Sequence, residues 1–196
     1  MCRFIESIRI EQGEAPLLPW HQQRMNACMD RFYPGSEPPD LRNIIQDYRH
    51  IQERHKLRLV YDDKVRQITC RPYEPVRISG FHLVNGDNLN YSWKYEDRSA
   101  LEKLKADIPP GYDIIIVRKG EVTDSSYANL AFKRNDQLYT PSRPLLKGCR
   151  RSMLLANGII KPAIITPESL KTYDGMYLIN GMLNPESASY YEPIFH

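Results

Sequence analysis

Long hydrophobic runs are absent from this sequence of 196 residues. No stretch approaches the roughly 20 apolar residues that a transmembrane helix needs, so we expect no interaction with a membrane. A secretory signal is also not recognisable at the start of the sequence. These absences lead us to expect a cytoplasmic protein.

Cysteine is sparse, and the four cysteines are widely separated: Cys2, Cys28, Cys70 and Cys149. No C-x-x-C pair occurs, so the spacing of a structural zinc site is missing. Disulfides are typical of small, cysteine-dense secreted domains, which this chain does not resemble. We therefore predict neither a metal site nor a disulfide.

A strong excess of one charge is likewise missing. The chain has 27 basic and 24 acidic residues, a formal net charge of +3, and the basic residues are scattered among the acidic ones. Nucleic-acid binders usually carry a concentrated basic patch, so we predict no nucleic-acid partner. A mildly basic pocket would instead suit a small molecule that carries phosphate or carboxylate.

What the sequence does contain is the composition and patterning of a globular α+β protein. Hydrophobic residues make up 41% of the chain and charged residues 26%. Residues 2–10 alternate as in a strand, residues 18–32 have helical spacing, Asp40 can cap a second helix, and residues 56–75 are typical of a hairpin. We expect residues 1–84 to form an N-terminal α+β domain and the polar residues 85–92 to form a linker.

Residues 93–196 should form a second domain. Asp97 can cap a helix that precedes Ile108. Short strands are predicted at 114–117, 130–132 and 137–139, with turns at Lys119-Gly120 and Asn135-Asp136, and further strands after residue 158. Many short strands with few helices indicate a barrel-like domain. A helix follows Gly148, and the backbone N–H groups at its start suit a phosphate.

Four ordered motifs lie in this second domain: Val122-Thr123-Asp124, then Asn129, then Thr140-Pro141, then Leu146-Lys147-Gly148-Cys149-Arg150-Arg151. They resemble the V-T-E-x-x-x-x-N, T-P and L-x-G-x-x-R pattern of the fold-type IV enzymes that depend on pyridoxal 5'-phosphate (PLP). This family includes branched-chain and D-amino-acid aminotransferases and aminodeoxychorismate lyase. The resemblance implies a two-domain fold like that of D-amino-acid aminotransferase, with a small α/β N-terminal domain and a barrel-like C-terminal domain.

The resemblance also implies roles for single residues. Lys94 opens the segment KYEDR, which is similar to K-H-L-N-R of aminodeoxychorismate lyase, where the lysine holds PLP as a Schiff base. Asp124 stands where the family has a glutamate that bonds to the pyridine nitrogen. Arg24 matches the arginine of an H-x-x-R helix that binds the cofactor phosphate. Taken alone, Arg24 and Lys94 would more often be solvated side chains, and Asp124 a turn residue.

Seven further residues complete the predicted cofactor site. Ser125 and Ser126 can contact the cofactor, and Asn129 should organise the loop. The phosphate should meet the backbone at Gly148, Cys149 and Arg150, with Arg150 supplying charge where relatives usually have a threonine. The seventh is Asn180, whose segment LINGM matches a phosphate-side loop weakly.

Three functions remain open from the sequence. A lyase would remove pyruvate from 4-amino-4-deoxychorismate and leave 4-aminobenzoate. A class IV aminotransferase would pass the amino group of a branched-chain or D-amino acid to a 2-oxo acid. A non-catalytic PLP-binding protein is the third reading, because Asp124 and Arg150 depart from the family pattern. The resemblance further implies a small amino compound as substrate and a homodimer.

Overall fold

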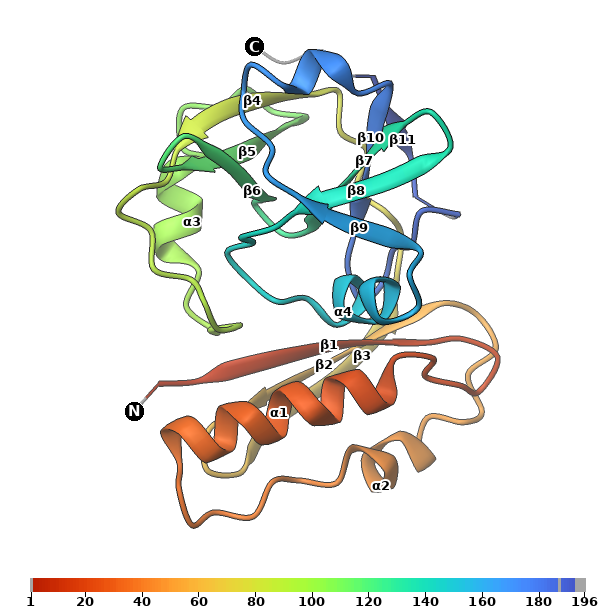
Figure 1. Ribbon diagram of the computed structural model, residues 1–196. Coiled ribbons are helices and arrows are strands. Elements are labelled where there is room, and N and C mark those ends of the chain that lie inside the picture. Colours follow the sequence, from red (N-terminus) through yellow and green to blue (C-terminus); the bar gives the residue numbers. More distant parts are fainter. Residues whose placement is uncertain (1, 187, 193–196) are drawn as a thin grey trace. The chain divides into compact units, whose positions relative to one another are not determined.

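The computed structural model describes residues 2–186 and 188–192 of the chain (Figure 1). The predicted α+β fold is confirmed, with two sheets and few helices. The chain divides into two compact units. Unit 1 comprises Met1–Pro75 and Trp93–Asp97, and unit 2 comprises Val76–Ser92 and Arg98–His196. Within the described residues, no helix is both long enough and apolar enough to cross a membrane.

Unit 1 contains an antiparallel sheet of three strands in the order β1-β2-β3. The strands are β1 (Phe4–Ile10), β2 (His55–Tyr61) and β3 (Val65–Pro72). Two helices, α1 (Leu18–Phe32) and α2 (Leu41–Gln46), contribute to the same core. Figure 1 shows both helices on one side of the three strands. Asp40 caps α2 as predicted, because its carboxylate accepts the backbone N–H of Arg42 at 2.8 Å.

The core of unit 1 follows from the alternation of side chains along its strands and from the helical spacing of side chains along α1. Alternate residues of β1 and β2 and helically spaced residues of α1 form one buried cluster, which includes Phe4, Ile8, Ile10, Met25, Cys28, Met29, Leu57 and Leu59. The segment Trp93–Asp97 joins this cluster, since the rings of Tyr95 and Phe4 lie 5.2 Å apart. Its backbone also pairs with β1 through the bridge between Phe4 and Tyr95.

Unit 2 contains a sheet of eight strands, in the order β11-β10-β7-β6-β5-β4, with β8 and β9 branching from β7. Their bounds are β4 (Gly80–Asn85), β5 (Tyr112–Arg118), β6 (Glu121–Ser125), β7 (Asn129–Arg134), β8 (Gln137–Pro141), β9 (Ile160–Ala163), β10 (Gly175–Ile179) and β11 (Tyr190–Tyr191). The helical elements are α3 (Ser99–Leu104), α4 (Cys149–Ala156) and the 3-10 turn η1 (Leu170–Thr172).

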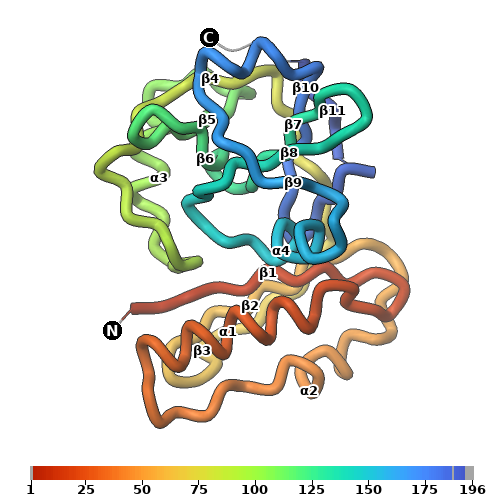
Figure 2. Tube along the Cα trace, viewed as in Figure 1, coloured from red at the N-terminus to blue at the C-terminus, as the bar shows by residue number. Residues whose placement is uncertain are grey.

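The two units divide the chain after Pro75, Ser92 and Asp97. The ranges predicted from the sequence were 1–84, 85–92 and 93–196. Residues 76–84 belong with unit 2, because β4 pairs in parallel with β5 along its full length. Residues 93–97 belong with unit 1, because they pair with β1. The chain thus passes between the units three times, and Figure 2 allows this path to be followed by residue colour. Such long-range pairing leaves no trace in local patterns.

The start of α3 differs from expectation, and strand β9 carries exposed apolar residues on both sides. The N-cap of α3 is Arg98 rather than Asp97, and no side chain caps that helix. Strand β9 pairs with β8 and carries Pro162 at its centre. On either side of β9, Ile159 and Ile164 are 47% and 64% exposed.

Candidate functional site

Three of the four sequence motifs of unit 2 meet at the buried carboxyl group of Asp124. This residue lies near the end of β6, and Asn129 opposite it opens β7. The Asn129 amide donates to Asp124 Oδ1 at 2.9 Å and to the carbonyl of Leu146 at 2.8 Å. The N–H of Leu146 donates to Asp124 Oδ2 at 2.9 Å. Strand pairing therefore brings the acid, the asparagine and the loop before α4 into one hydrogen-bonded cluster.

Burial dominates the electrostatics of Asp124. It raises the pKa of this carboxyl group from 3.8 to about 7, although the hydrogen bonds from Leu146 and Asn129 and the charge of Arg151 act in the opposite direction. The group lies 5% exposed and has no salt bridge to a described residue at 4.0 Å or less. A buried carboxyl group with a raised pKa ionises readily when a cationic N–H group is placed beside it.

Gly148 is the N-cap of α4, and no side chain caps the helix there. A Cβ on this residue would lie 2.1 Å from Asn129 Oδ1, so only glycine lets the loop approach the Asp124 cluster this closely. The helix begins at Cys149, and both Cys149 and Arg150 are buried. Its first turn carries the positive end of the helix dipole, which suits an anion.

Arg151 explains why the T-P and G-x-x-R motifs occur together. Its guanidinium donates to Thr140 Oγ1 at 3.2 Å and to the carbonyl of Pro141 at 2.8 Å. These bonds fix the end of β8 against the first turn of α4. The sequence showed Arg151 only as a match to the motif, whereas the structure makes it the residue that joins two parts of the site.

The turn that follows Asp124 is built by Ser125. Its hydroxyl accepts the N–H of Ala128 at 3.1 Å and that of Tyr127 at 3.4 Å. The next residue, Ser126, is held through its carbonyl, to which Arg98 donates at 2.7 Å. Arg98, the last residue of KYEDR, therefore supports this turn, and nothing in its own sequence environment indicated that contact.

Lys94 lies in unit 1, beside β1. Its carbonyl accepts the N–H of Ile5 at 2.9 Å, and its side chain is half-buried. The ring of Tyr95 packs into the core of unit 1. Side chains alternate along an extended segment, so Lys94 projects from the opposite face of the sheet.

Arg24 also lies in unit 1, on α1, where it is bound to the fully buried Glu6 of β1. Its Nε donates to Glu6 Oε1 at 2.8 Å, and its Nη2 contacts Glu6 Oε2. His21 Nδ1 lies 2.6 Å from the same Oε2. Burial would raise the pKa of Glu6, but the charge of Arg24 and the hydrogen bond from His21 lower it to about 2. Sequence reasoning missed Glu6, although a glutamate among the apolar residues of one strand face was a signal.

Asn180 follows β10, and its side chain closes a turn. Its Oδ1 accepts the N–H groups of Met182 and Leu183 at 2.8 and 3.0 Å. The structure thus places two predicted residues, Arg24 and Lys94, in unit 1, and the others in unit 2.

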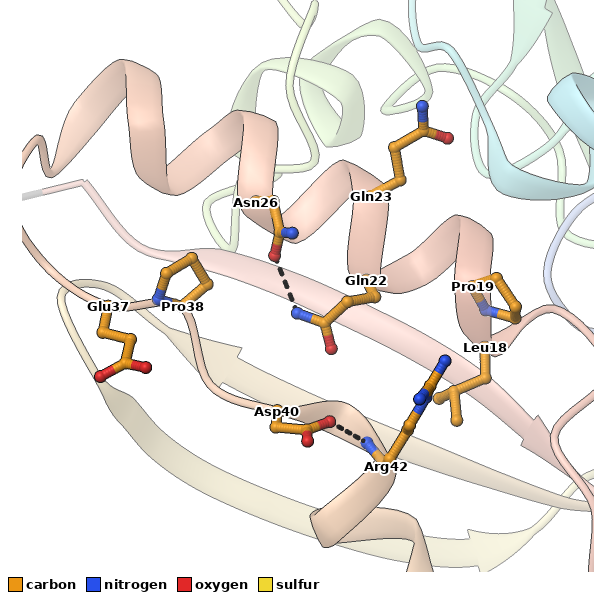
Figure 3. Close-up of a pocket in the computed structure, with 9 residues that line it drawn as sticks. All are labelled: Leu18, Pro19, Gln22, Gln23, Asn26, Glu37, Pro38, Asp40 and Arg42. Atoms are coloured by element: carbon orange, nitrogen blue, oxygen red, sulfur yellow. Dashed lines mark hydrogen bonds between the residues drawn. The ribbon is translucent and has the colours of Figure 1, made fainter.

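A separate shallow groove of about 580 Å³ lies on unit 1 between α1 and residues 37–42 (Figure 3). Its wall includes Gln22, whose amide donates to Asn26 Oδ1 at 2.8 Å and to the carbonyl of Pro39 at 3.0 Å. The Gln22 amide therefore bonds within the wall of the groove. None of the predicted site residues, all of which are described, lines it.

A family model described as amino-transferase class IV matches residues 93–184, the region of the Asp124 cluster. A crystal structure from Haemophilus somnus, provisionally named a 4-amino-4-deoxychorismate lyase, is 34% identical with a TM-score of 0.86, covering 93% of this chain and 97% of the other. A Schizosaccharomyces pombe protein, provisionally named an aminodeoxychorismate lyase, is 29% identical over 86% of this chain and 81% of its own.

A more distant structure shares the fold. It is a hypothetical aminotransferase from Mycobacterium tuberculosis in its PLP-bound form, 18% identical, with a TM-score of 0.73 and coverage of 96% of this chain and 80% of the other. The fold-type IV architecture inferred from the motifs is therefore confirmed.

Proposed function

Because the chain belongs to the class IV aminotransferase family, we propose that it is a PLP-dependent enzyme with the reaction of a 4-amino-4-deoxychorismate lyase. That reaction releases pyruvate and leaves 4-aminobenzoate. The hydrogen-bonded cluster around Asp124 is the observation that carries the cofactor assignment. The names of the Haemophilus somnus and Schizosaccharomyces pombe relatives support the choice of a lyase.

The residues of unit 2 fit the cofactor. PLP supplies an electron-accepting ring when it is bound, and this needs a protonated pyridine nitrogen. Asp124, buried and with a pKa near neutrality, is suited to receive that N–H and to become charged as it does so. Its shorter side chain, compared with the family glutamate, is held by Asn129 and Leu146. Ser125 ends β6 and Ser126 follows it, and both would help to hold the cofactor.

The phosphate requires an anion site, which the start of α4 provides. We propose that the backbone at Gly148, Cys149 and Arg150 binds it, with charge from Arg150 and with Asn180 nearby in the family arrangement. Arg24 is the second source of charge. Glu6 contacts its Nε and Nη2 and so orients the guanidinium.

Lys94 would hold the cofactor covalently and later carry a proton at the substrate. The Lys94 side chain is half-buried. An amine released from a covalent bond in such a place can accept a proton from the substrate and return it. The proposal includes a homodimer, as the resemblance to the family implies.

Absorbance of the protein with added PLP tests the cofactor assignment. Borohydride treatment followed by peptide mass spectrometry should leave the cofactor on the peptide that contains Lys94. Lys94→Ala should abolish this attachment, whereas Lys64→Ala, which removes an exposed lysine of the same unit, should not. Attachment to another lysine would contradict the role of Lys94.

A second experiment separates the lyase from the aminotransferase that the family name keeps as the alternative. Pyruvate and 4-aminobenzoate should appear together when the protein is given 4-amino-4-deoxychorismate. Transfer of an amino group to a 2-oxo acid, without pyruvate release, would favour the aminotransferase. Bound PLP with neither turnover would favour a non-catalytic PLP-binding protein.

A further inference from the structure

One face of the unit 1 sheet is strongly basic. Ile8, Ile10, Leu57 and Leu59 point into the core with α1, so the alternate residues of these strands point to the opposite face. Two rows cross that face. The first joins Ser7, Arg58 and Thr69, which are paired across β1, β2 and β3, and the second joins Arg9, Lys56 and Arg71. We call these six residues the basic face.

The second row places like charges directly opposite each other. Arg9 pairs with Lys56, and Lys56 pairs with Arg71. Directly opposed like charges destabilise an antiparallel sheet. Three cations in one row are therefore an arrangement that an anion on this face would stabilise.

The first row offers a different set of donors. Arg58 is paired on each side with a hydroxyl-bearing residue, Ser7 on β1 and Thr69 on β3. A guanidinium matches the geometry of a carboxylate, and hydroxyl groups can add further hydrogen bonds to it. All three side chains are half-buried, which strengthens a hydrogen bond to a charged group.

Nearby acids offset only part of this charge. Glu96 lies 3.7 Å from both Arg58 and Arg3, a separation too long for hydrogen bonds. Glu11 contacts Arg9 and lies 3.3 Å from Arg54. Arg9 Nε is buried, and within the described residues it has no hydrogen-bond partner.

Lys94 projects from the same face. The Phe4–Tyr95 bridge places the Tyr95 ring on the core side, so Lys94 and Glu96 alternate to the other side, as the contact of Glu96 with Arg58 shows. Lys94 bonds to Ile5, and the row of Arg58 begins two residues further along β1. Two residues of strand span roughly 7 Å, a distance that the long side chains of Arg58 and Lys94 can bridge.

We propose that the basic face binds the carboxylate groups of the substrate, with Arg58, Ser7 and Thr69 as the first contact and the row of Arg9, Lys56 and Arg71 as the second. This rests on the proposed role of Lys94 at the substrate amine. It identifies the substrate as an amino compound with two carboxylates at separate positions, one for each row. Arg58 is then a residue that determines specificity.

The test uses the protein without PLP, so its result does not depend on the cofactor assignment, which the borohydride experiment decides separately. Isophthalate, a ring with two carboxylates, is titrated against the 15N-labelled protein, and benzamide serves as the uncharged comparison. Isophthalate should shift the amide signals of Ser7, Arg58 and Thr69, and benzamide should not.

Arg58→Gln should weaken isophthalate roughly tenfold to a hundredfold, since it removes a charged hydrogen-bond donor. Arg42→Gln makes the same charge change on α2, which packs against the opposite face, and should leave the affinity unchanged. If Arg58→Gln does not fold, Arg71→Gln replaces it, because Arg71 is exposed. Absence of binding, shifts centred elsewhere, or equal affinities of wild type and the basic-face variant would overturn the proposal.

Discussion

Two buried carboxyl groups, Glu6 and Asp124, have pKa values that are shifted in opposite directions. Both are almost inaccessible, at 0% and 5% exposure. Glu6 contacts Arg24 and His21, and its pKa falls to about 2. Burial raises the pKa of Asp124 to about 7, because its hydrogen-bond donors are uncharged and lower it only in part. The difference shows that burial alone does not set the charge of a carboxyl group, because the charge of its partners decides it.

Stability of the PLP-free protein should therefore depend on Asp124 above pH 5. The folded state keeps the Asp124 proton up to about pH 7, whereas the unfolded chain releases it near pH 3.8, so stability falls as the pH rises through this window. Between pH 5.5 and 8 the loss should be about 2 kcal/mol. Urea unfolding at both pH values measures it.

Asp124→Asn is the matched control for this dependence. The variant should be less stable at every pH, because the amide cannot accept both hydrogen bonds. It should also lose the change of about 2 kcal/mol with pH, which corresponds to about 1.5 pKa units. An unchanged pH dependence in the variant would refute the assignment to Asp124.

Glu6→Gln should cost about 3 kcal/mol of unfolding free energy, since it leaves Arg24 and His21 without their buried anion. The wild type should also lose stability as the pH falls from 4.5 towards 2, because the unfolded glutamate takes up a proton before the folded one does. The variant should lack this acid-dependent part.

Glu11→Gln provides the comparison for Glu6. Its carboxylate also contacts two arginines, but the side chain is 26% exposed, so the substitution should cost less than about 1 kcal/mol. Urea unfolding measures both losses. Similar losses of unfolding free energy in the two variants would show that burial of Glu6 adds no stability beyond that of an exposed ion pair.

At the scale of elements, the path of the loop between β8 and α4 depends on the absence of a side chain at Gly148. A methyl group on Gly148 would meet Asn129 Oδ1 at 2.1 Å, although the backbone there, with φ of −69°, would accept any residue. Gly148→Ala should therefore cost roughly 1–3 kcal/mol through overpacking.

Asn129→Ala supplies the test that this cost is steric. In that background the added methyl group meets no amide, so the Gly148→Ala penalty should largely disappear in a double-mutant cycle of urea unfolding. A penalty that stays the same in both backgrounds would place its cause elsewhere in the loop.

The elements themselves were largely predictable, because their signals are local. Alternation predicted β1 and helical spacing predicted α1, and the Lys119-Gly120 and Asn135-Asp136 turns lie where β5 meets β6 and β7 meets β8. The pattern of Asp124, Asn129 and Gly148 predicted a common site, and the structure joins these three residues. The contact between Glu6 and Arg24 spans 18 positions, and that between Arg98 and Ser126 spans 28, so no local pattern encodes either one.

At the scale of the whole molecule, the five residues Trp93–Asp97 belong to unit 1, while both neighbouring stretches belong to unit 2. Tyr95→Ala should remove ring contacts with Phe4 and Phe32 and release this segment from β1. Hydrogen exchange of the Ile5 amide, which donates to Lys94, should accelerate at least tenfold. The same change at Tyr73, whose ring contacts Lys56, should not alter that exchange.

Unchanged protection of Ile5 in Tyr95→Ala would mean that backbone pairing alone holds the segment. The expected result would instead link the position of Lys94 to an aromatic cluster that takes no part in the chemistry. Substitutions in that cluster would then alter cofactor attachment without touching the cofactor.

Strand β9, with Pro162 at its centre, has a consequence for how copies of the protein behave at high concentration. Exposed strand edges can pair with one another and seed aggregates, especially beside apolar side chains such as Ile159 and Ile164. Proline offers no N–H and interrupts a new ladder of hydrogen bonds. Pro162 therefore protects the solubility of the chain at a place where its isoleucines would otherwise favour association.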